Sequence, residues 1–189
     1  MKIALDCDDV LVDANASLAV FHNERYGTSY TRDDVKHWHL EHIWNCSREE
    51  ACRRVDEWLE SHHHASMNAM PGAIEAVGLL SLNHELPVVT ARSELRALET
   101  SALLDRHFGG KLAGIHFTNG FAKNRRSKGD VCLELGATLI IEDSSEHAYD
   151  NASKGMTVLL MDSPWNQGVK NTSKIVRVFG WRGALDFIG

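Results

Sequence analysis

The chain has 189 residues, 43% of them hydrophobic, and a formal net charge of −6, which predicts one globular domain with room for a small insert. The acidic excess argues against a protein that coats nucleic acid. No run reaches the ~20 consecutive apolar residues of a membrane span, and the first residues predict a strand rather than a signal peptide. The four cysteines show no CxxC spacing, so we expect a reducing, cytoplasmic setting. From the net charge and the lack of an apolar span we expect neither nucleic acid nor a membrane as a partner.

The most informative stretch is residues 2–13. A short apolar run, Ile3 to Leu5, predicts a buried strand, and carboxylates follow it at Asp6, Asp8, Asp9 and Asp13. Ligands bind beyond the carboxyl ends of strands in open α/β sheets, where Asp6 and Asp8 can converge as the chain curls into its loop. Such a cluster repels itself unless a cation or a shared proton lies within it. It therefore predicts Mg²⁺ held by oxygen ligands, with a solvated acidic turn as the alternative.

Residues 14–70 carry helical patterns throughout. A helix is predicted over 14–26, with Gly27 as its stop, and a capping box at Thr31 predicts a second, short helix. Ser47 is followed three residues later by Glu50, a stronger signal for the start of a further helix. We therefore expect an all-helical insert between two segments that contain strands.

Two tryptophans of this insert, Trp38 and Trp44, lie in less periodic sequence between helices. A tryptophan that faces a pocket can stack on a nucleobase and so set substrate specificity. The alternative is that both belong to the core of the insert. Three consecutive histidines, at residues 62–64, point in different directions on a helix and cannot all bind one ion, so a solvated helix end is expected there.

Residues 86–92 predict the second strand, which ends at Thr90. The Thr90 hydroxyl can donate to a phosphoryl oxygen, and Ser93 can cap a following helix whose amides favour an anion. Arg92 is a candidate for a charge-assisted contact to phosphate, or else a surface arginine.

Further along, Ser127 predicts a helix N-cap, which places Lys128 at the first helical position. Lys123 is the second candidate for a lysine in the site. Residues 138–143 predict another buried strand, again ending in acid, at Glu142 and Asp143. The alternation of strands and helices by itself predicts an α/β fold.

The stretch Asp6-Cys7-Asp8-Asp9-Val10-Leu11 resembles the first motif of the haloacid dehalogenase superfamily of phosphotransferases. Asp9-Val10 replaces the usual Gly-Thr, as in the 5′(3′)-deoxyribonucleotidase-like branch, and a Pro-aromatic-Asn loop at 164–166 is similar to that branch. Four motifs follow the family's order over nearly the whole chain. The resemblance implies a Rossmann-like parallel sheet flanked by helices, built from residues 1–13 and 71–189, with a small helical cap at 14–70.

The resemblance also implies roles for single residues. Asp6 is the nucleophile that becomes an aspartyl-phosphate, and Asp8 is the general acid and base. The implied Mg²⁺ ligands are Asp6, the Asp8 carbonyl and Asp143, with Glu142 acting through water. Thr90 and Lys128 match the phosphate-binding second and third motifs. Asp8 must hold a proton in the first step, and we expect its acidic neighbours to raise its pKa.

The implied function is a Mg²⁺-dependent phosphatase, and the branch suggests a 5′-nucleotidase whose substrates are (deoxy)ribonucleoside monophosphates. A phosphatase for another small phosphometabolite or for a nucleic-acid end remains an alternative, the latter on the basic block of residues 123–128. An alternative of another class is a non-catalytic phosphate-binding domain. The sequence does not give base preference or oligomeric state.

Overall fold

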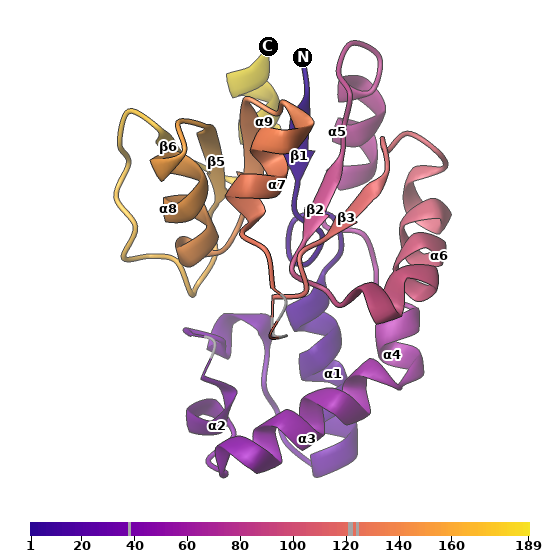
Figure 1. Ribbon diagram of the computed structural model, residues 1–189. Helices are drawn as coiled ribbons and strands as arrows, with labels where there is room; N and C mark the ends of the chain where they lie inside the picture. The colour runs from indigo at the N-terminus through magenta and orange to yellow at the C-terminus, as the bar shows by residue number, and fades with distance from the viewer. Residues whose placement is uncertain (38, 121–122, 124) are drawn as a thin grey trace.

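The computed structural model describes residues 1–189 except residues 38, 121, 122 and 124. A single parallel sheet forms its centre, with the strand order β3-β2-β1-β4-β5-β6 (Figure 1). The strands are β1 (Ile3–Leu5), β2 (Val88–Thr90), β3 (Ile115–Phe117), β4 (Leu139–Glu142), β5 (Thr157–Met161) and β6 (Ile175–Val178). The predicted α/β fold with a Rossmann-like parallel sheet is confirmed.

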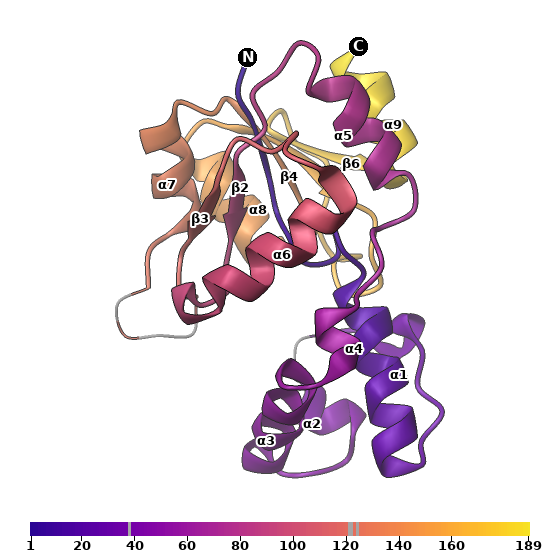
Figure 2. The ribbon, with the colours of Figure 1, turned by 90° about the vertical axis from the view of Figure 1, so that its right-hand side faces the viewer.

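Helices cover both faces of this sheet (Figure 2). They are α5 (Ala73–Leu80), α6 (Ala97–Phe108), α7 (Lys128–Leu135), α8 (Ser145–Ser153) and α9 (Gly180–Ile188). Alternate strand residues supply the two apolar layers, as the pleat of a strand requires. In β4, Ile141 belongs to the core cluster shared with α5, α6 and α9, whereas Ile140 belongs to the cluster shared with α7 and α8.

The strand order reverses direction beside β1. Strands β1, β2 and β3 succeed one another toward one edge, whereas β4, β5 and β6 succeed one another toward the other. Leu5 pairs with Val88 on one side and with Ile141 on the other, so the loops after β1, β2 and β4 leave the sheet at a similar level. This is a topological switch point, the place where ligands bind in open α/β sheets.

Further helical elements occupy the chain between β1 and α5. They are α1 (Ala14–Tyr26), the 3₁₀ turn η1 (Arg32–Asp34), α2 (Leu40–Ile43), α3 (Arg48–Leu59) and α4 (His62–Ala65). They lie together beyond the carboxyl ends of the strands (Figure 1). The division into a core and a cap at residues 14–70 stays a prediction. No helix in the described part of the chain is long and apolar enough to cross a membrane.

The helix starts and stops that the sequence predicts in this segment are found in the structure, but one of the predicted helices is shorter than expected. Gly27 ends α1 at a positive φ of 66°, a conformation that glycine adopts without the strain of a side chain. Ser47 accepts a hydrogen bond from the Glu50 N–H and so caps α3. The capping box at Thr31 also forms, but it opens only the single turn η1, because Val35 already has an extended backbone. The second predicted helix is therefore shortened.

Candidate active site

Three buried carboxylates meet at the carboxyl ends of β1 and β4. Asp6 follows β1, Glu142 ends β4 and Asp143 comes next, and one oxygen of each lies within 4.8 Å of the others. Their exposed fractions are 5%, 0% and 3%. The backbone N–H of Asp6 donates to the Ile141 carbonyl at 3.0 Å, which holds the two strand ends at one level. The fold thus brings Asp6 together with Asp143 and Glu142, whereas Asp8, expected to converge with Asp6, is not part of this group; their role as metal ligands stays a prediction.

Lys128 is the cation of this cluster. It is the first residue of α7 and is 1% exposed, and its Nζ lies 2.7 Å from Asp6 Oδ1 and 2.9 Å from Glu142 Oε2. Ser127 caps α7 as predicted, accepting from the Asp130 N–H while its hydroxyl donates to Asp150. Lys123, the second candidate, is exposed. The helix N-cap at Ser127 therefore places Lys128, and not Lys123, in the site.

The cluster carries more negative than positive charge. Burial, with Glu142 adding to it, raises the pKa of Asp6 to about 7 against the opposing effect of Lys128. Burial together with Glu142 and Asp6 also raises the pKa of Asp143 well above its usual range. Burial opposes the charge of Lys128, but the carboxylates of Asp6 and Glu142 outweigh it and raise the lysine pKa. An added divalent cation would relieve this imbalance.

Asp8 lies beside the cluster and is held by Arg92. The Arg92 guanidinium donates from Nη2 to Asp8 Oδ1 at 2.6 Å and from Nε to Oδ2 at 2.9 Å. Only 8% of the Arg92 side chain is exposed, so the surface-arginine alternative is wrong. Burial acts to raise the pKa of Asp8, but Arg92 outweighs it and lowers that pKa. The raised pKa expected from acidic neighbours is therefore wrong for this arrangement, because a bidentate arginine favours the ionised form.

Thr90 ends β2 and is fully buried. Its Oγ1 accepts a hydrogen bond from the Arg92 N–H at 3.2 Å, and its carbonyl accepts from both the N–H and the hydroxyl of Thr118. These contacts fix the loop that carries Arg92. The position of Thr90 fits the predicted phosphate-binding role, which stays a prediction.

The loop after β5 positions Asp143, a role that no pattern in the sequence assigns to it. Trp165 donates from Nε1 to Asp143 Oδ2 at 2.8 Å, and Asn166 donates from Nδ2 to the Asp143 carbonyl at 2.8 Å. Arg177 in turn donates to Asn166 Oδ1 at 2.7 Å. The Pro-aromatic-Asn pattern was the available signal, but only the fold shows what its side chains contact.

Asp9 connects the site to the helical segment. It is 1% exposed, has a positive φ of 57° and accepts from Asn15 Nδ2 at 2.7 Å. Arg32 approaches from η1, with Nε 3.4 Å from Asp9 Oδ1, and its guanidinium lies 4.9 Å from the Trp165 ring centre. Burial raises the pKa of Asp9 to about 7, with Arg32 opposing. Arg32 thus contacts both the loop after β1 and a side chain that holds Asp143.

Trp44 does not face the site. It is 8% exposed and stacks on His22, with ring centres 4.3 Å apart and an interplanar angle of 20°, so the predicted stacking on a nucleobase is wrong and Trp44 belongs to the core of the helical segment. Trp38 lies outside the described residues. The solvated helix end is also wrong for His64, which is 3% exposed and packs edge-on against Trp58.

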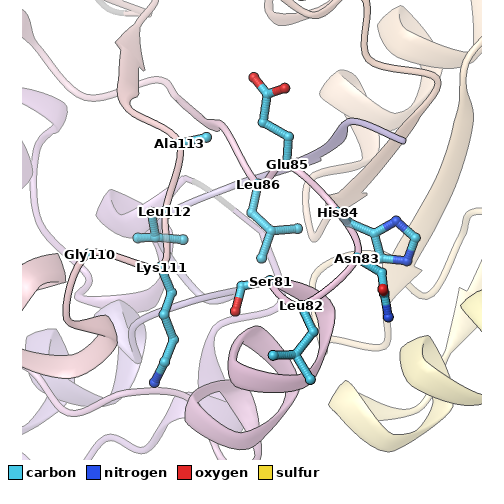
Figure 3. A pocket seen from close by; sticks show the side chains of 10 residues that line it. All are labelled: Ser81, Leu82, Asn83, His84, Glu85, Leu86, Gly110, Lys111, Leu112 and Ala113. Carbon is cyan, nitrogen blue, oxygen red and sulfur yellow. The ribbon is translucent and has the colours of Figure 1, made fainter.

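A surface hollow of about 440 Å³ lies elsewhere, lined by residues 81–86 and 110–113 (Figure 3). These residues precede β2 and β3. Because the strands are parallel, the hollow is at the amino ends of the strands, opposite the carboxylates. It therefore plays no part in the site formed by Asp6, Glu142 and Asp143.

Comparisons with known proteins agree with this geometry. A protein named nucleotidase from Clostridium acetobutylicum is 25% identical over 185 residues, which is 96% of this chain and 90% of that protein. A haloacid dehalogenase-like hydrolase from Streptococcus pneumoniae superposes with a TM-score of 0.73 at 14% identity, covering 100% of this chain and 98% of that one. A HAD-hydrolase from Bacillus subtilis, solved bound to magnesium, gives 0.66 at 15% identity, covering 99% and 97%.

The family model described as 5′ nucleotidase, deoxy (pyrimidine), cytosolic type C protein (NT5C) matches residues 1–188. The match spans the sheet, the helical segment and every residue of the carboxylate cluster. The chain therefore belongs to this 5′-nucleotidase family and is a hydrolase, and it shares its fold with haloacid dehalogenase-like hydrolases.

Proposed function

We propose that this protein is a Mg²⁺-dependent phosphomonoester hydrolase that works through an aspartyl-phosphate and acts on (deoxy)ribonucleoside 5′-monophosphates. The observation that carries the chemistry is the placement of Asp6. Its Oδ1 accepts from the Cys7 N–H and contacts Lys128 Nζ, both at 2.7 Å. Within the described residues these contacts engage Oδ1, which leaves Oδ2 to attack phosphorus.

The residues present fit a hard divalent ion. Asp6, Glu142 and Asp143 offer oxygen ligands only, the type that Mg²⁺ prefers. Asp6, Asp143 and the backbone carbonyl of Asp8 would hold the ion, and Glu142, already bound to Lys128, would act through water. When bound, Mg²⁺ stabilises negative charge on the phosphoryl oxygens.

The chain's own residues supply the remaining chemistry. Asp6 forms a bond to phosphorus while the bond from phosphorus to the leaving oxygen breaks, and Asp8 gives that oxygen its proton. Asp8 then takes a proton from the water that releases phosphate. Lys128 and Thr90 are fixed donors that favour the charged phosphoryl group.

The mechanism requires one further step, in which Asp8 gains a proton, because the ion pair with Arg92 keeps Asp8 ionised. A phosphate dianion that enters beside Arg92 competes with Asp8 for the guanidinium. Loss of that pair lets the pKa of Asp8 rise, which prepares it to donate a proton. Arg92 thereby serves both as a phosphate ligand and as the group that links substrate binding to the protonation of Asp8.

The substrate class rests on family membership and on the relative named nucleotidase. A nucleic-acid end as substrate finds less support, because Arg126 of the basic block forms an ion pair with Glu134 at 2.5 Å. Arg32 reaches the site from the helical segment, where its guanidinium can meet the leaving group. The helices of residues 14–70 would act as the cap that excludes water.

The test is a screen of phosphate release with Mg²⁺ over nucleoside 5′-monophosphates, sugar phosphates and a 3′-phosphorylated oligonucleotide. We expect the nucleotides to be hydrolysed best, exhaustive chelation to stop turnover, and acid quenching to trap labelled phosphate on Asp6. Phosphate binding without turnover on any compound would instead support a non-catalytic domain. Label on another residue would overturn the mechanism.

A further inference from the structure

A second group of potential metal ligands lies in the helical segment, apart from the carboxylate cluster. It comprises His39 before α2, and Glu41 and His42 within α2. Helix α2 lies at the left flank of the helical segment as drawn in Figure 1. Both histidines are exposed and Glu41 is half-buried, so ions from solvent can reach this group without any change in the fold.

The distances within the group suit one small ion. One ligand atom from each of His39, Glu41 and His42 lies within 4.8 Å of the others, and His39 Nδ1 is 3.3 Å from Glu41 Oε1. Ligand atoms around a tetrahedral Zn²⁺, with bonds of about 2.0–2.1 Å, are separated by about 3.4 Å. The His39–Glu41 pair already has this separation, and a side-chain rotation brings in His42.

A third imidazole completes the arrangement. The ring centre of His37 is 5.9 Å from that of His39 and 5.9 Å from that of His42, and the latter two are 5.7 Å apart. The rings therefore form a nearly equilateral triangle. Imidazoles that share one tetrahedral ion have ring centres about 5 Å apart, so His37 is within reach as a fourth ligand. Ligation by His37 requires the 3.3 Å hydrogen bond from the His39 N–H to its Nδ1 to break, because the ring nitrogen that does not bind the ion must carry the proton.

Histidine density alone does not produce such a site in this chain. Of the three consecutive histidines, His64 packs against Trp58 and His63 lies 3.0 Å from Glu24. Their side chains are engaged with different neighbours, whereas those of His39 and His42 converge. The nitrogen-rich donor set also differs from the all-oxygen cluster, and it selects a borderline ion such as Zn²⁺ over Mg²⁺.

We propose that His39, Glu41 and His42, with His37 as a fourth ligand, form a separate site for Zn²⁺ or a similar borderline divalent ion. The ion ties the chain before α2 to α2 itself. That chain continues from Arg32, which contacts Asp9, so occupation of the site stiffens the part of the helical segment that reaches the carboxylate cluster. The site itself does not depend on the proposed phosphatase activity.

The test is calorimetric titration of the full chain with ZnCl₂ in excess Mg²⁺, which occupies the oxygen site. We expect one Zn²⁺ per chain, and His39→Ala and His42→Ala to weaken binding by about tenfold or more each. His37→Ala should weaken it less, because His37 lies outside the tighter group. His62→Ala, at an exposed histidine, and Cys52→Ser, at an exposed thiol, are controls and should leave the affinity unchanged.

Co²⁺ gives a second readout, since a tetrahedral nitrogen-rich site produces an intense visible absorption band, whereas a six-coordinate all-oxygen site absorbs only weakly. That band should appear in the wild type and be lost in the His39→Ala/His42→Ala double variant, with folding checked by circular dichroism. Equal Zn²⁺ binding by the wild type and the double variant would overturn the proposal. The same holds if the wild type binds no Zn²⁺, or if a control variant removes the binding.

Discussion

The edge of the sheet and the helical segment contribute to the site in different ways. At the sheet edge each functional group follows a strand or begins a helix and has a close partner, as Asp6 has Lys128 at 2.7 Å. The helical segment reaches the site through Arg32, whose contacts to Asp9 and Asp13 are longer, at 3.4 and 3.5 Å. Rigid elements thus position the proposed chemistry, whereas the helices contact the loop after β1 through side chains such as Arg32 and Asn15. We expect substitutions at the edge to change rates, and substitutions in the helices to change stability.

The largest expected effect at the sheet edge is that of Asp6→Asn. The amide keeps the shape of the side chain but is no nucleophile, so kcat should fall by about 10⁴-fold or more. Asp33→Asn, at an exposed carboxylate of η1, is the matched control and should retain full activity. Steady-state phosphate release measures both. Substantial residual turnover in Asp6→Asn would exclude Asp6 as the nucleophile.

Lys128→Met should impair both rate and stability. The change leaves Asp6 and Glu142 buried without their cation, which costs about 3–5 kcal/mol of unfolding free energy. The loss of a fixed donor should also lower kcat by about 10²–10³-fold. Lys123→Met at the exposed alternative lysine should change neither quantity. Equal effects of the two substitutions in denaturant titrations and rate assays would refute the assignment.

Trp44→Ala tests whether substitutions in the helical segment change stability rather than the catalytic rate. Removal of this buried ring from its stack on His22 should lower the unfolding free energy by about 3–5 kcal/mol. If part of the protein then unfolds under the assay conditions, kcat/KM for a nucleotide and for an aryl phosphate should fall by the same factor. Val20→Ala, at an exposed position of α1, serves as the control. A selective loss of nucleotide hydrolysis at unchanged stability would restore the base-stacking role.

The sequence predicts the sheet edge better than the helical segment, for physical reasons. Strand ends and caps are local signals, so Asp6, Asp143 and the Ser127–Lys128 helix start could be located without coordinates. The pairing of Arg92 with Asp8 joins residues 84 positions apart in the chain. No local pattern encodes it, and so the predicted pKa of Asp8 had the wrong direction.

The helical segment is less predictable from its sequence, because aromatic and histidine side chains serve equally well in a core and in a site. The lack of periodicity around Trp44 and the sequence neighbours of His64 do not indicate whether either side chain is buried. Their burial depends on how α1, α3 and α4 pack together. Packing of short helices is decided by tertiary contacts, which the sequence pattern does not specify.

A smaller effect is expected from Arg92→Met. If phosphate competes with Asp8 for Arg92, the variant should bind inorganic phosphate about tenfold or more weakly, because a hydrogen bond to a charged group contributes about 1.5–3 kcal/mol. Competitive inhibition by phosphate gives this constant. Arg96→Met is the control, since Arg96 bonds to Glu60 and to the Leu59 carbonyl instead. An unchanged inhibition constant would confine Arg92 to its contact with Asp8.

The smallest expected effect concerns His22, which supports the helical segment and can be tested through pH. Arg54 donates to His22 Nε2 at 3.0 Å, so the ring is neutral and its Nδ1–H donates to the Thr28 hydroxyl at 2.8 Å. Burial, with Arg54 adding to it, lowers the pKa of His22 to about 4. In the unfolded chain a histidine has a pKa of about 6.5.

Between those two pKa values the unfolded chain binds a proton that the folded protein excludes. The contribution of neutral His22 to stability is therefore complete above about pH 6.5 and is lost as the pH falls toward 4, with about 2 kcal/mol lost by pH 5. Urea unfolding at pH 7 and pH 5 should show a smaller loss in His22→Gln than in the wild type, by about that amount. The buried His64 and the acidic cluster titrate in both proteins, so the difference isolates His22, and His62→Gln should behave as the wild type. Identical pH dependence in His22→Gln and the wild type would mean that the folded protein accepts the proton, and that the Arg54 hydrogen bond does not keep the ring neutral.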